Sequence, residues 1–213
     1  MVIPFICTST NTVKSSVSYL DQVIVGNLLG DAWMDRSPRA LNTRLRYEQA
    51  SPKHDDRFFL VYKYYVFLCS SNARVRDRYD KRSDRQYFMN FFSTRSLPYL
   101  TEFYNMFYIL TDTGRYRKIV PANIELYITF VVLSFWIMDD GHWNWGLVLN
   151  TQGFTVPDVV RLSDAINTSL NLKSYMRMEA GAPVIYITLA DVKKITPQLV
   201  QHMHPSTYYK LGL

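Results

Sequence analysis

Hydrophobic runs of helical length recur along the chain, and two of them end in the same way. The run Val25–Leu29 leads through Gly30 to Asp31, and the run Ser134–Met138 leads through Asp139 to Asp140. The C-terminus of a helix carries a partial negative charge, so an aspartate there is unfavourable unless a cation lies against it. Two such endings in one chain predict a duplicated unit whose paired carboxylates bind metal.

The first half of the sequence predicts helix, strand, helix, strand, strand and helix in that order. The first helix begins at Tyr19 or Asp21 and ends near Asp31. Strict alternation over residues 41–48 predicts a strand with Leu41, Thr43, Leu45 and Tyr47 on one face and Asn42, Arg44, Arg46 and Glu48 on the other. We expect a helix over Phe58–Leu68, a charged hairpin loop over Arg74–Arg85, a strand over Gln86–Thr94 and a helix over Leu97–Leu110.

The second half repeats this order after a basic, turn-like stretch that ends at Lys118. Thr155 and Asp158 have the spacing of a capping box, which predicts the start of a helix. We expect a helix ending at Asp140, strands over Trp143–Gln152, Lys173–Glu179 and Pro183–Thr188, and a closing helix over Leu189–His202. The sequence therefore predicts an α+β protein with an N-terminal arm at 1–18 and two halves at 19–117 and 118–213.

Composition and charge narrow the class of protein. Hydrophobic residues make up 48% and charged residues 20% of the chain, which is typical of a globular protein. The net charge of +6 suits a polyanion. We favour nucleic acid over a membrane, because the basic residues gather in predicted strands and the longest apolar run, Leu126–Met138, is too short to span a bilayer. Cys7 and Cys69 are too few for a disulfide framework or a zinc site.

Four segments resemble the LAGLIDADG homing endonuclease family, in its single-chain type with two motifs that mitochondrial introns encode. Ile24–Ala32 and Leu133–Gly141 match the signature, with Asp31 and Asp140 at its final acid. The stretch 147–152 with Phe154, and Tyr209–Leu211 near the C-terminus, are also similar to the family. The resemblance implies a pseudo-twofold, duplicated αββαββα fold in which two antiparallel sheets form a DNA-binding saddle.

The resemblance also implies a metal-dependent active site that cuts both strands of a long, asymmetric DNA target. Its expected Mg²⁺ ligands are Asp31 and Asp140, helped by the backbone carbonyls of Gly30 and Asp139. Lys118 and Lys210 correspond to the basic residues near each active site, and Gln152 and Glu48 either orient a metal-bound water or contact a base.

Physical reasoning supports the metal site independently. Gly26 and Gly30 have i, i+4 spacing, so one helix face lacks side chains and a second helix can approach closely. Packing the two signature helices together brings their terminal aspartates to the same end of the interface. Adjacent carboxylates need a cation between them, and hard divalent ions prefer oxygen ligands.

The polar strand faces predict a surface that reads DNA. Arginine recognises guanine in the major groove, and asparagine or glutamine recognises adenine. The candidates in the first half are Asn42, Arg44, Arg46, Glu48, Arg74, Arg76 and Arg85. Those in the second half are Asn150, Gln152, Arg177, Glu179 and Tyr186.

Two alternatives remain open at this stage. The same fold can act as an RNA maturase that binds its own group I intron and assists splicing, with or without DNA cleavage. A non-catalytic DNA-binding regulator is the other alternative, which two intact aspartates disfavour. We expect a monomer that binds no membrane. The acid-free N-terminus has only one basic residue, Lys14, where a transit peptide would have several arginines, which favours a gene carried by a mitochondrion or chloroplast.

Overall fold

The computed structural model describes residues 17–213 except 38, 82 and 83. Most of the expected N-terminal arm, including Cys7, therefore lies outside the described residues. Its last residue, Ser18, starts the first helix. The Ser18 hydroxyl accepts a hydrogen bond from the backbone N–H of Asp21, and the Asp21 carboxylate accepts one from the backbone N–H of Ser18. This reciprocal capping box satisfies two backbone donors that helix formation leaves unpaired.

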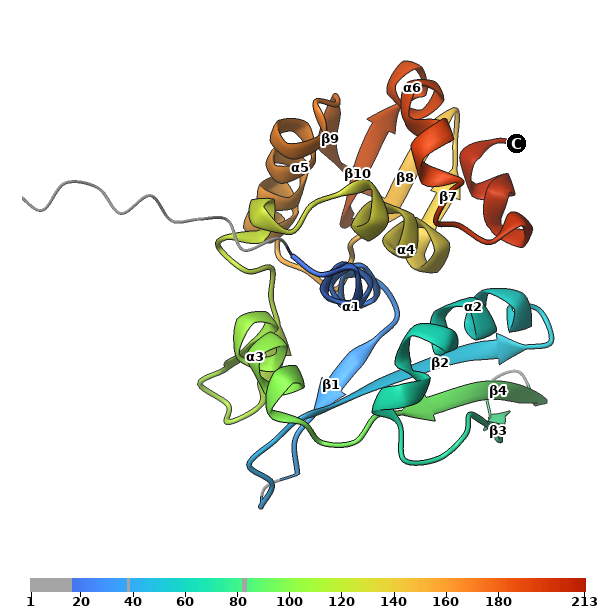
Figure 1. Ribbon diagram of the computed structural model, residues 1–213. Helices are drawn as coiled ribbons and strands as arrows, with labels where there is room; N and C mark the ends of the chain where they lie inside the picture. The colour runs from blue at the N-terminus through green and yellow to red at the C-terminus, as the bar shows by residue number, and fades with distance from the viewer. Residues whose placement is uncertain (1–16, 38, 82–83) are drawn as a thin grey trace, which may run out of the picture.

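Each half of the chain follows the order helix, two strands, helix, two strands, helix (Figure 1). The first half consists of α1 (Tyr19–Leu29), β1 (Trp33–Asp35), β2 (Arg44–Ser51), α2 (Asp55–Tyr65), β3 (Arg74–Asp80), β4 (Arg85–Ser93) and α3 (Pro98–Phe107). The second half consists of α4 (Phe130–Asp140), β7 (Gly141–Trp143), β8 (Gly146–Asn150), α5 (Val156–Leu170), β9 (Ser174–Glu179), β10 (Ala182–Thr188) and α6 (Leu189–Leu199).

A small hairpin joins the two halves, and short 3₁₀ turns complete the chain. The hairpin pairs β5 (Tyr108–Leu110) with β6 (Tyr116–Lys118), so Lys118 lies at the end of the connector. The 3₁₀ helices are η1 (Val66–Leu68), η2 (Ile124–Leu126) and η3 (Pro205–Leu211). Lys210 lies in η3, near the C-terminus.

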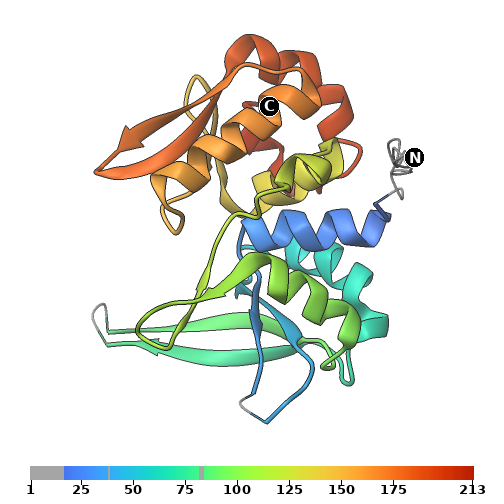
Figure 2. The same cartoon turned by 90° about the vertical axis from the view of Figure 1, so that its left-hand side faces the viewer.

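The two halves form equivalent sheets, which confirms the predicted duplicated α+β fold. Each sheet is antiparallel and has four strands, in the orders β1-β2-β4-β3 and β7-β8-β10-β9. Helices lie between the sheets, and the long strands β3–β4 and β9–β10 extend past the helices on the same side of the molecule (Figure 2). The arrangement places the protruding strands of both sheets on one side of the molecule, as a saddle requires.

Four parts of the prediction differ from the structure. The strand expected over 41–48 begins at Arg44, Leu41 is 88% exposed instead of buried, and the preceding strand β1 was not predicted. The single strand expected over Trp143–Gln152 is the hairpin β7–β8, which turns at Trp145 with φ 53°. The charged loop expected from Arg74 is strand β3, because its backbone pairs with β4 from Arg74 opposite Phe91 to Asp80 opposite Arg85. The helix expected to reach Leu110 ends at Phe107, where the chain leaves the helix to pair with β6. In each case the backbone forms a strand pair that the local sequence pattern did not indicate.

The two signature helices are buried on all sides. Every residue from Val23 to Leu29 in α1 is buried, and so is every residue from Val131 to Asp139 in α4. A helix without a polar face has to lie inside the protein. Figure 1 shows α1 end-on at the centre of the molecule, between α4 and the first sheet.

The glycines of α1 allow α4 to approach unusually closely. A Cβ built on Gly26 would lie 2.7 Å from the carbonyl oxygen of Val132 and 2.8 Å from the Cβ of Phe135. A Cβ built on Gly30 would lie 2.5 Å from the Cβ of Asp139. The helices therefore meet where the i, i+4 glycine spacing predicted, and the contact continues to the ends that carry the aspartates.

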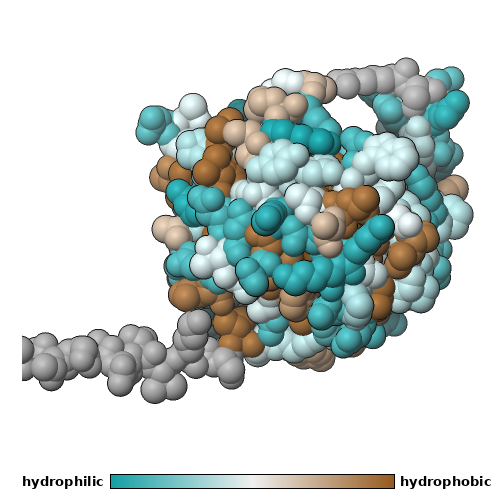
Figure 3. All heavy atoms as spheres, turned by 90° about the horizontal axis from the view of Figure 1, so that it is seen from above, coloured by the Kyte–Doolittle hydropathy of each residue, from teal (hydrophilic) through white to brown (hydrophobic). Residues whose placement is uncertain are grey.

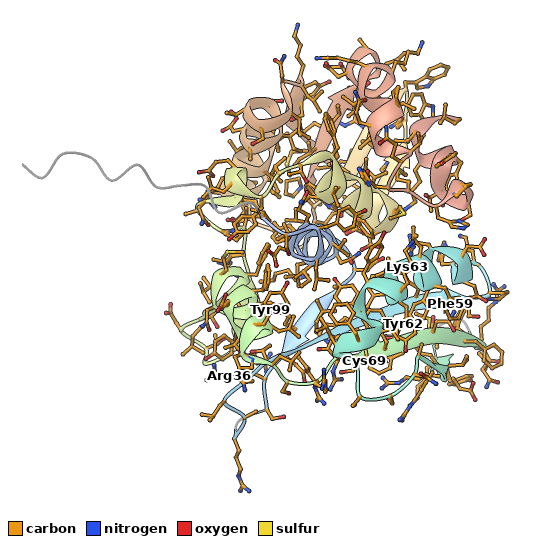
Figure 4. The ribbon with its side chains drawn as sticks, in the orientation of Figure 1. Arg36, Phe59, Tyr62, Lys63, Cys69 and Tyr99 are labelled. Atoms are coloured by element: carbon orange, nitrogen blue, oxygen red, sulfur yellow. The ribbon has the colours of Figure 1, made fainter. Side chains whose placement is uncertain are left out.

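Aromatic side chains fix α1 to the first half. Tyr62 of α2 packs its ring against those of Phe58 and Phe92, at centroid distances of 6.2 and 5.4 Å. On the other side of the half, the hydroxyl of Tyr99 in α3 donates a hydrogen bond to the Asp21 carboxylate. Figure 4 shows Tyr62 and Tyr99 on their separate helices, both below α1 in that view. Tyr62 thus packs α2 against the first sheet, and Tyr99 links α3 to the start of α1.

Among the helices of the described residues, none has both the length and the apolar composition to cross a bilayer. Seen from above, the protein has hydrophilic and hydrophobic residues interspersed over its surface (Figure 3). Single apolar side chains on a surface are ordinary for a globular protein.

Adding one methyl group to the helix contact should destabilise the fold. We expect Gly30→Ala to lower the free energy of unfolding by about 1–3 kcal/mol, because its Cβ has to displace α4. Thermal unfolding measures this as a fall in Tm of about 2–4 °C per kcal/mol in a domain of this size. Gly153→Ala is the matched control, since no atom lies within 4 Å of its added Cβ. An equal fall in Tm for both variants would contradict a tight contact at Gly30.

Candidate active site

The two signature aspartates lie at adjacent helix ends. Asp31 follows Gly30, the C-cap of α1, and Asp140 is the last residue of α4. The backbone N–H of Asp31 donates a hydrogen bond to the Asp139 carboxylate at 3.3 Å, so the two helix ends are in direct contact. The close approach of α1 and α4 thus brings together the two carboxylates predicted to bind metal.

Asp139 is enclosed beneath this pair. Its carboxylate accepts hydrogen bonds from the Tyr47 hydroxyl at 2.5 Å and from the Asn27 amide at 3.0 Å. Burial, and then the nearby Asp31 carboxylate, raise the pKa of Asp139 to about 6. These hydrogen bonds join the end of α4 to α1 and occupy the Asp139 carboxylate, so its oxygens are not free to bind a metal. Its backbone carbonyl, the predicted metal ligand, accepts a hydrogen bond from Lys210 Nζ at 2.9 Å.

Asp140 lines an open pocket between the halves. Gly30, Lys118, Asn150 and Gln152 line the same pocket. Burial, followed by the charges of Asp31 and Asp139, raises the pKa of Asp140 to about 7. Burial and neighbouring negative charges both disfavour the ionised form of a carboxyl group.

One lysine caps each signature helix. Lys118 Nζ donates to the carbonyl oxygens of Leu28 and Ala32, at 2.9 and 2.7 Å. Lys210 Nζ donates to those of Met138 and Asp139, at 2.7 and 2.9 Å. Both ammonium groups therefore lie at the negative ends of the helix dipoles, beside the aspartates.

Burial affects the two lysines alike. It lowers the pKa of Lys118 to about 8, and burial together with the Arg57 charge lowers the pKa of Lys210 to about 8. The two lysines are the cations that the paired helix endings required. They also bring two positive charges to the helix ends that carry the aspartates.

Two residues that the sequence analysis missed contact Asp31. The Gln49 amide donates to Asp31 Oδ2 at 2.6 Å, and a guanidinium nitrogen of Arg57 lies 3.6 Å from the same oxygen. Gln49 could have been found by extending the alternation of residues 41–48 by one position, which places it on the core face with Leu45 and Tyr47. Arg57 gave no signal, because a single arginine near the start of a helix is ordinary.

Glu48 and Gln152 have different surroundings. Glu48 alternates with buried Tyr47 and Gln49, so its side chain faces away from Asp31 toward the open face of the sheet. Gln152 is exposed, lines the Asp140 pocket, and lies 3.3 Å from Asn150 through their amide groups. Of the two predicted water-orienting residues, the structure brings only Gln152 to an aspartate.

The oxygen-rich composition of this site fits a hard divalent cation. No group of three or more His, Cys, Asp or Glu side chains that could hold a metal occurs within the described part of the chain. Asp31 and Asp140 offer two carboxylates at the adjoining ends of α1 and α4. Mg²⁺ suits such a site, since it is usually bound by one or two carboxylates and completes its shell with water and substrate phosphate.

The open face of the first sheet gathers arginines in one depression. Its lining includes Arg44, Arg46, Arg74 and Arg76. Asp35 binds two of them, with its Oδ1 2.9 Å from Arg44 Nε and 3.0 Å from Arg46 Nε. Of the other predicted DNA-contacting residues of this half, Arg85 is exposed, whereas Asn42 is half-buried and lies in a bend before β2 begins at Arg44.

The second sheet presents a row of mixed polar groups. Arg177 forms an ion pair with Glu179, and its guanidinium lies 4.6 Å from the ring centre of Tyr186. The Tyr186 hydroxyl donates to the backbone carbonyl of Trp145 at 2.8 Å. Arg177, Glu179 and Tyr186 therefore lie together on this sheet, whereas Asn150 and Gln152 lie closer to Asp140.

Comparisons with known proteins agree with this geometry. The model of the LAGLIDADG DNA endonuclease family matches residues 21–195. A cytochrome b mRNA maturase of Debaryomyces hansenii is 29% identical over 97% of this chain and 80% of its own length. A maturase of the same name from Saccharomyces cerevisiae is 27% identical, and this chain matches 46% of that longer protein. A probable intron-encoded endonuclease of Wickerhamomyces canadensis is 25% identical over 90% of this chain and 83% of its own length.

A solved structure has the same fold. The homing endonuclease I-WcaI bound to its DNA recognition sequence superposes with a TM-score of 0.78 at 24% identity, covering 92% of this chain and 88% of that one. The family model includes both signature helices and both aspartates. This chain therefore belongs to the LAGLIDADG DNA endonuclease family, in the single-chain form that carries two signature motifs.

Proposed function

We propose that this protein is an intron-encoded, site-specific endonuclease that cuts both strands of a long, asymmetric DNA target. The observation that carries the proposal is the meeting of Asp31 and Asp140 at one site, between two sheets that present polar side chains on the same side. One chain supplies both aspartates and both sheets, which supports action as a monomer. The two sheets have different side chains, so the target need not be symmetric.

Asp31 and Asp140 would hold divalent cations, with Mg²⁺ as the proposed metal and the backbone carbonyls of Gly30 and Asp139 as further oxygen donors. Bound there, the metal would stabilise the attacking and leaving oxygens of the phosphodiester. The predicted roles of Lys118 and Lys210 follow from their positions. Each ammonium donates to two carbonyls, so its third N–H would be available to a phosphate oxygen or to water.

In this proposal the exposed faces of the two four-stranded sheets bind the DNA. We propose that Arg44, Arg46, Arg74 and Arg76 approach the major groove with the first sheet, and Arg177, Glu179 and Tyr186 with the second. Arginine donors pair with guanine, and amides such as Asn150 pair with adenine. Asn42, Glu48 and Arg85 extend the first surface. The Asp35 carboxylate keeps Arg44 and Arg46 in place without DNA and has to share them when DNA binds.

A maturase activity is the second candidate function. Its support is the named activity of the Debaryomyces hansenii relative, which matches 97% of this chain. In this reading the protein also binds its own intron RNA. Splicing of a group I intron transcript with and without the protein tests it. The names of the relatives, intron-encoded endonucleases and a cytochrome b mRNA maturase, also support a gene located in an organelle.

Removing either carboxylate should stop cleavage without stopping binding. We expect Asp31→Asn and Asp140→Asn each to abolish double-strand cutting, because each leaves the metal one ligand short. DNA affinity should stay the same or rise, since a negative charge facing phosphate is lost. Plasmid cleavage and gel-shift assays measure the two effects on a target selected from a randomised library. Wild-type cutting by either variant would remove that aspartate from the proposed site.

We expect Arg46 to affect base recognition and Lys210 to affect the rate of cleavage. Arg46→Ala should relax preference at one or two base pairs, at a cost of about 1–3 kcal/mol for the correct base. Lys210→Met should cut slowly while it binds almost normally, because its proposed partner is charge that develops during the reaction. Cleavage of a complete set of single-base target variants gives both profiles.

Lys193→Ala is the control for simple loss of positive charge. Lys193 is exposed on α6 and lies outside both proposed surfaces. Tm has to be measured beside activity, because Lys210 also caps α4. If Lys210→Met changes base preference and Arg46→Ala does not, the assigned roles are reversed.

A further inference from the structure

A buried arginine joins the first half of the chain to the second signature helix. Arg57, near the start of α2, is 3% exposed. Its guanidinium donates hydrogen bonds to the carbonyl oxygens of Met138 and Asp139, at the end of α4. Burial removes the hydration of a guanidinium, which is unfavourable unless protein acceptors replace the water, so these partners have to remain in place.

The same guanidinium reaches Asp31 through Gln49. One Arg57 nitrogen donates to the Gln49 side-chain oxygen, and the Gln49 amide donates to Asp31 Oδ2 at 2.6 Å. Because Arg57 occupies the oxygen of Gln49, the amide nitrogen has to point toward Asp31. Arg57 therefore fixes which way the glutamine side chain is turned, and the glutamine fixes one oxygen of the carboxylate.

The second half has no equivalent of this chain of contacts. When Asp31 and Asp140 are taken as equivalent, Trp33 corresponds to His142, and their partners Arg46 and Val148 correspond across the two sheets. Three residues further on, Thr151 then takes the position of Gln49. The Thr151 hydroxyl donates to the carbonyl of Pro183, at 2.7 Å, within its own sheet. The third residue of α5, which corresponds to Arg57 in α2, is Asp158 and pairs with Arg161. Throughout residues 17–37, 39–81 and 84–213, the Asp140 carboxylate has no hydrogen bond or ion pair like those of Asp31.

We infer that Arg57 is a positioning residue for Asp31 and makes the two strand cuts unequal. The inference rests on the proposed function, because it assigns a role within that reaction. Asp31 is oriented by Arg57 and Gln49, whereas Asp140 is left to be oriented by metal and DNA. Loss of Arg57 then impairs the cut that depends on the orientation of Asp31 and leaves the other cut less affected.

The experiment follows the two strands separately. The variants are Arg57→Met, Arg57→Lys, Gln49→Leu and the double variant of Arg57→Met with Gln49→Leu. The substrate is a supercoiled plasmid with a target selected from a randomised library by the wild-type protein, and a labelled duplex identifies the cut strand. We expect Arg57→Met and Gln49→Leu to slow the same strand by about 10- to 100-fold, the usual effect of losing a partner that orients a metal ligand.

Nicked plasmid should therefore accumulate, always cut in the other strand. Arg57→Lys should restore part of the rate if its shorter side chain reaches Gln49. The double variant should be no slower than Gln49→Leu, because Arg57 acts through the glutamine.

A purely structural role for Arg57 predicts a different result. Loss of the α4 carbonyl contacts would lower Tm and slow both strands equally, and the effects of the two substitutions would then add. Arg161→Met is the matched control, since Arg161 also donates to a backbone carbonyl and to a carboxylate, those of Val120 and Asp158. Its strand ratio should equal that of the wild type. Equal slowing of both strands by Arg57→Met would overturn the inference.

A second readout needs no metal or DNA. In Arg57→Met, the side-chain amide protons of Gln49 should exchange with solvent faster than in the wild type, measured by NMR in EDTA. Unchanged exchange would mean that Arg57 does not hold the glutamine, and the inference fails. If the wild-type protein selects no cleavable DNA, the proposed function itself fails, and the NMR result still decides whether Arg57 orients Gln49.

Discussion

The close contact between α1 and α4 is the constraint on which the rest of the structure depends. Gly26 and Gly30 leave no side chain between the helices, so their C-terminal ends meet. Two negative helix ends and their aspartates would repel one another in a buried interface. Lys118 and Lys210 offset this repulsion by binding the last carbonyls of each helix. The fold and the proposed site thus share the same residues.

The consecutive residues Asp139 and Asp140 have different roles, one in packing and one in the proposed chemistry. Asp139 is enclosed by Tyr47 and Asn27 and joins the two helices, whereas Asp140, the next residue, lies in the open pocket. A helix turns by about 100° per residue, so adjacent side chains point to different surroundings. Two consecutive aspartates can therefore serve as one structural group and one proposed metal ligand.

The two halves are similar in backbone topology but differ in the side chains around the aspartates. Both sheets have the same strand order, and both lysines cap a helix in the same manner. The surroundings of the two aspartates differ. Asp31 accepts a hydrogen bond from Gln49 and lies beside the Arg57 guanidinium, and within the described residues Asp140 has no such contacts. A duplicated chain can change one half without changing the other, so an asymmetric target and unequal strand cuts are both compatible with this fold.

The sequence by itself predicted the helix contact at the glycines and the pairing of Asp31 with Asp140, whereas the complete αββαββα order of each half was implied by the resemblance to the family. These features depend on local pattern: apolar runs, glycine spacing and the residue at each helix end. Only the tertiary structure decided that residues 74–80 form a strand, because that strand depends on pairing with β4. Tertiary structure alone also brought Arg57 to the carbonyls of α4, since residues far apart in sequence meet only when both halves have packed together.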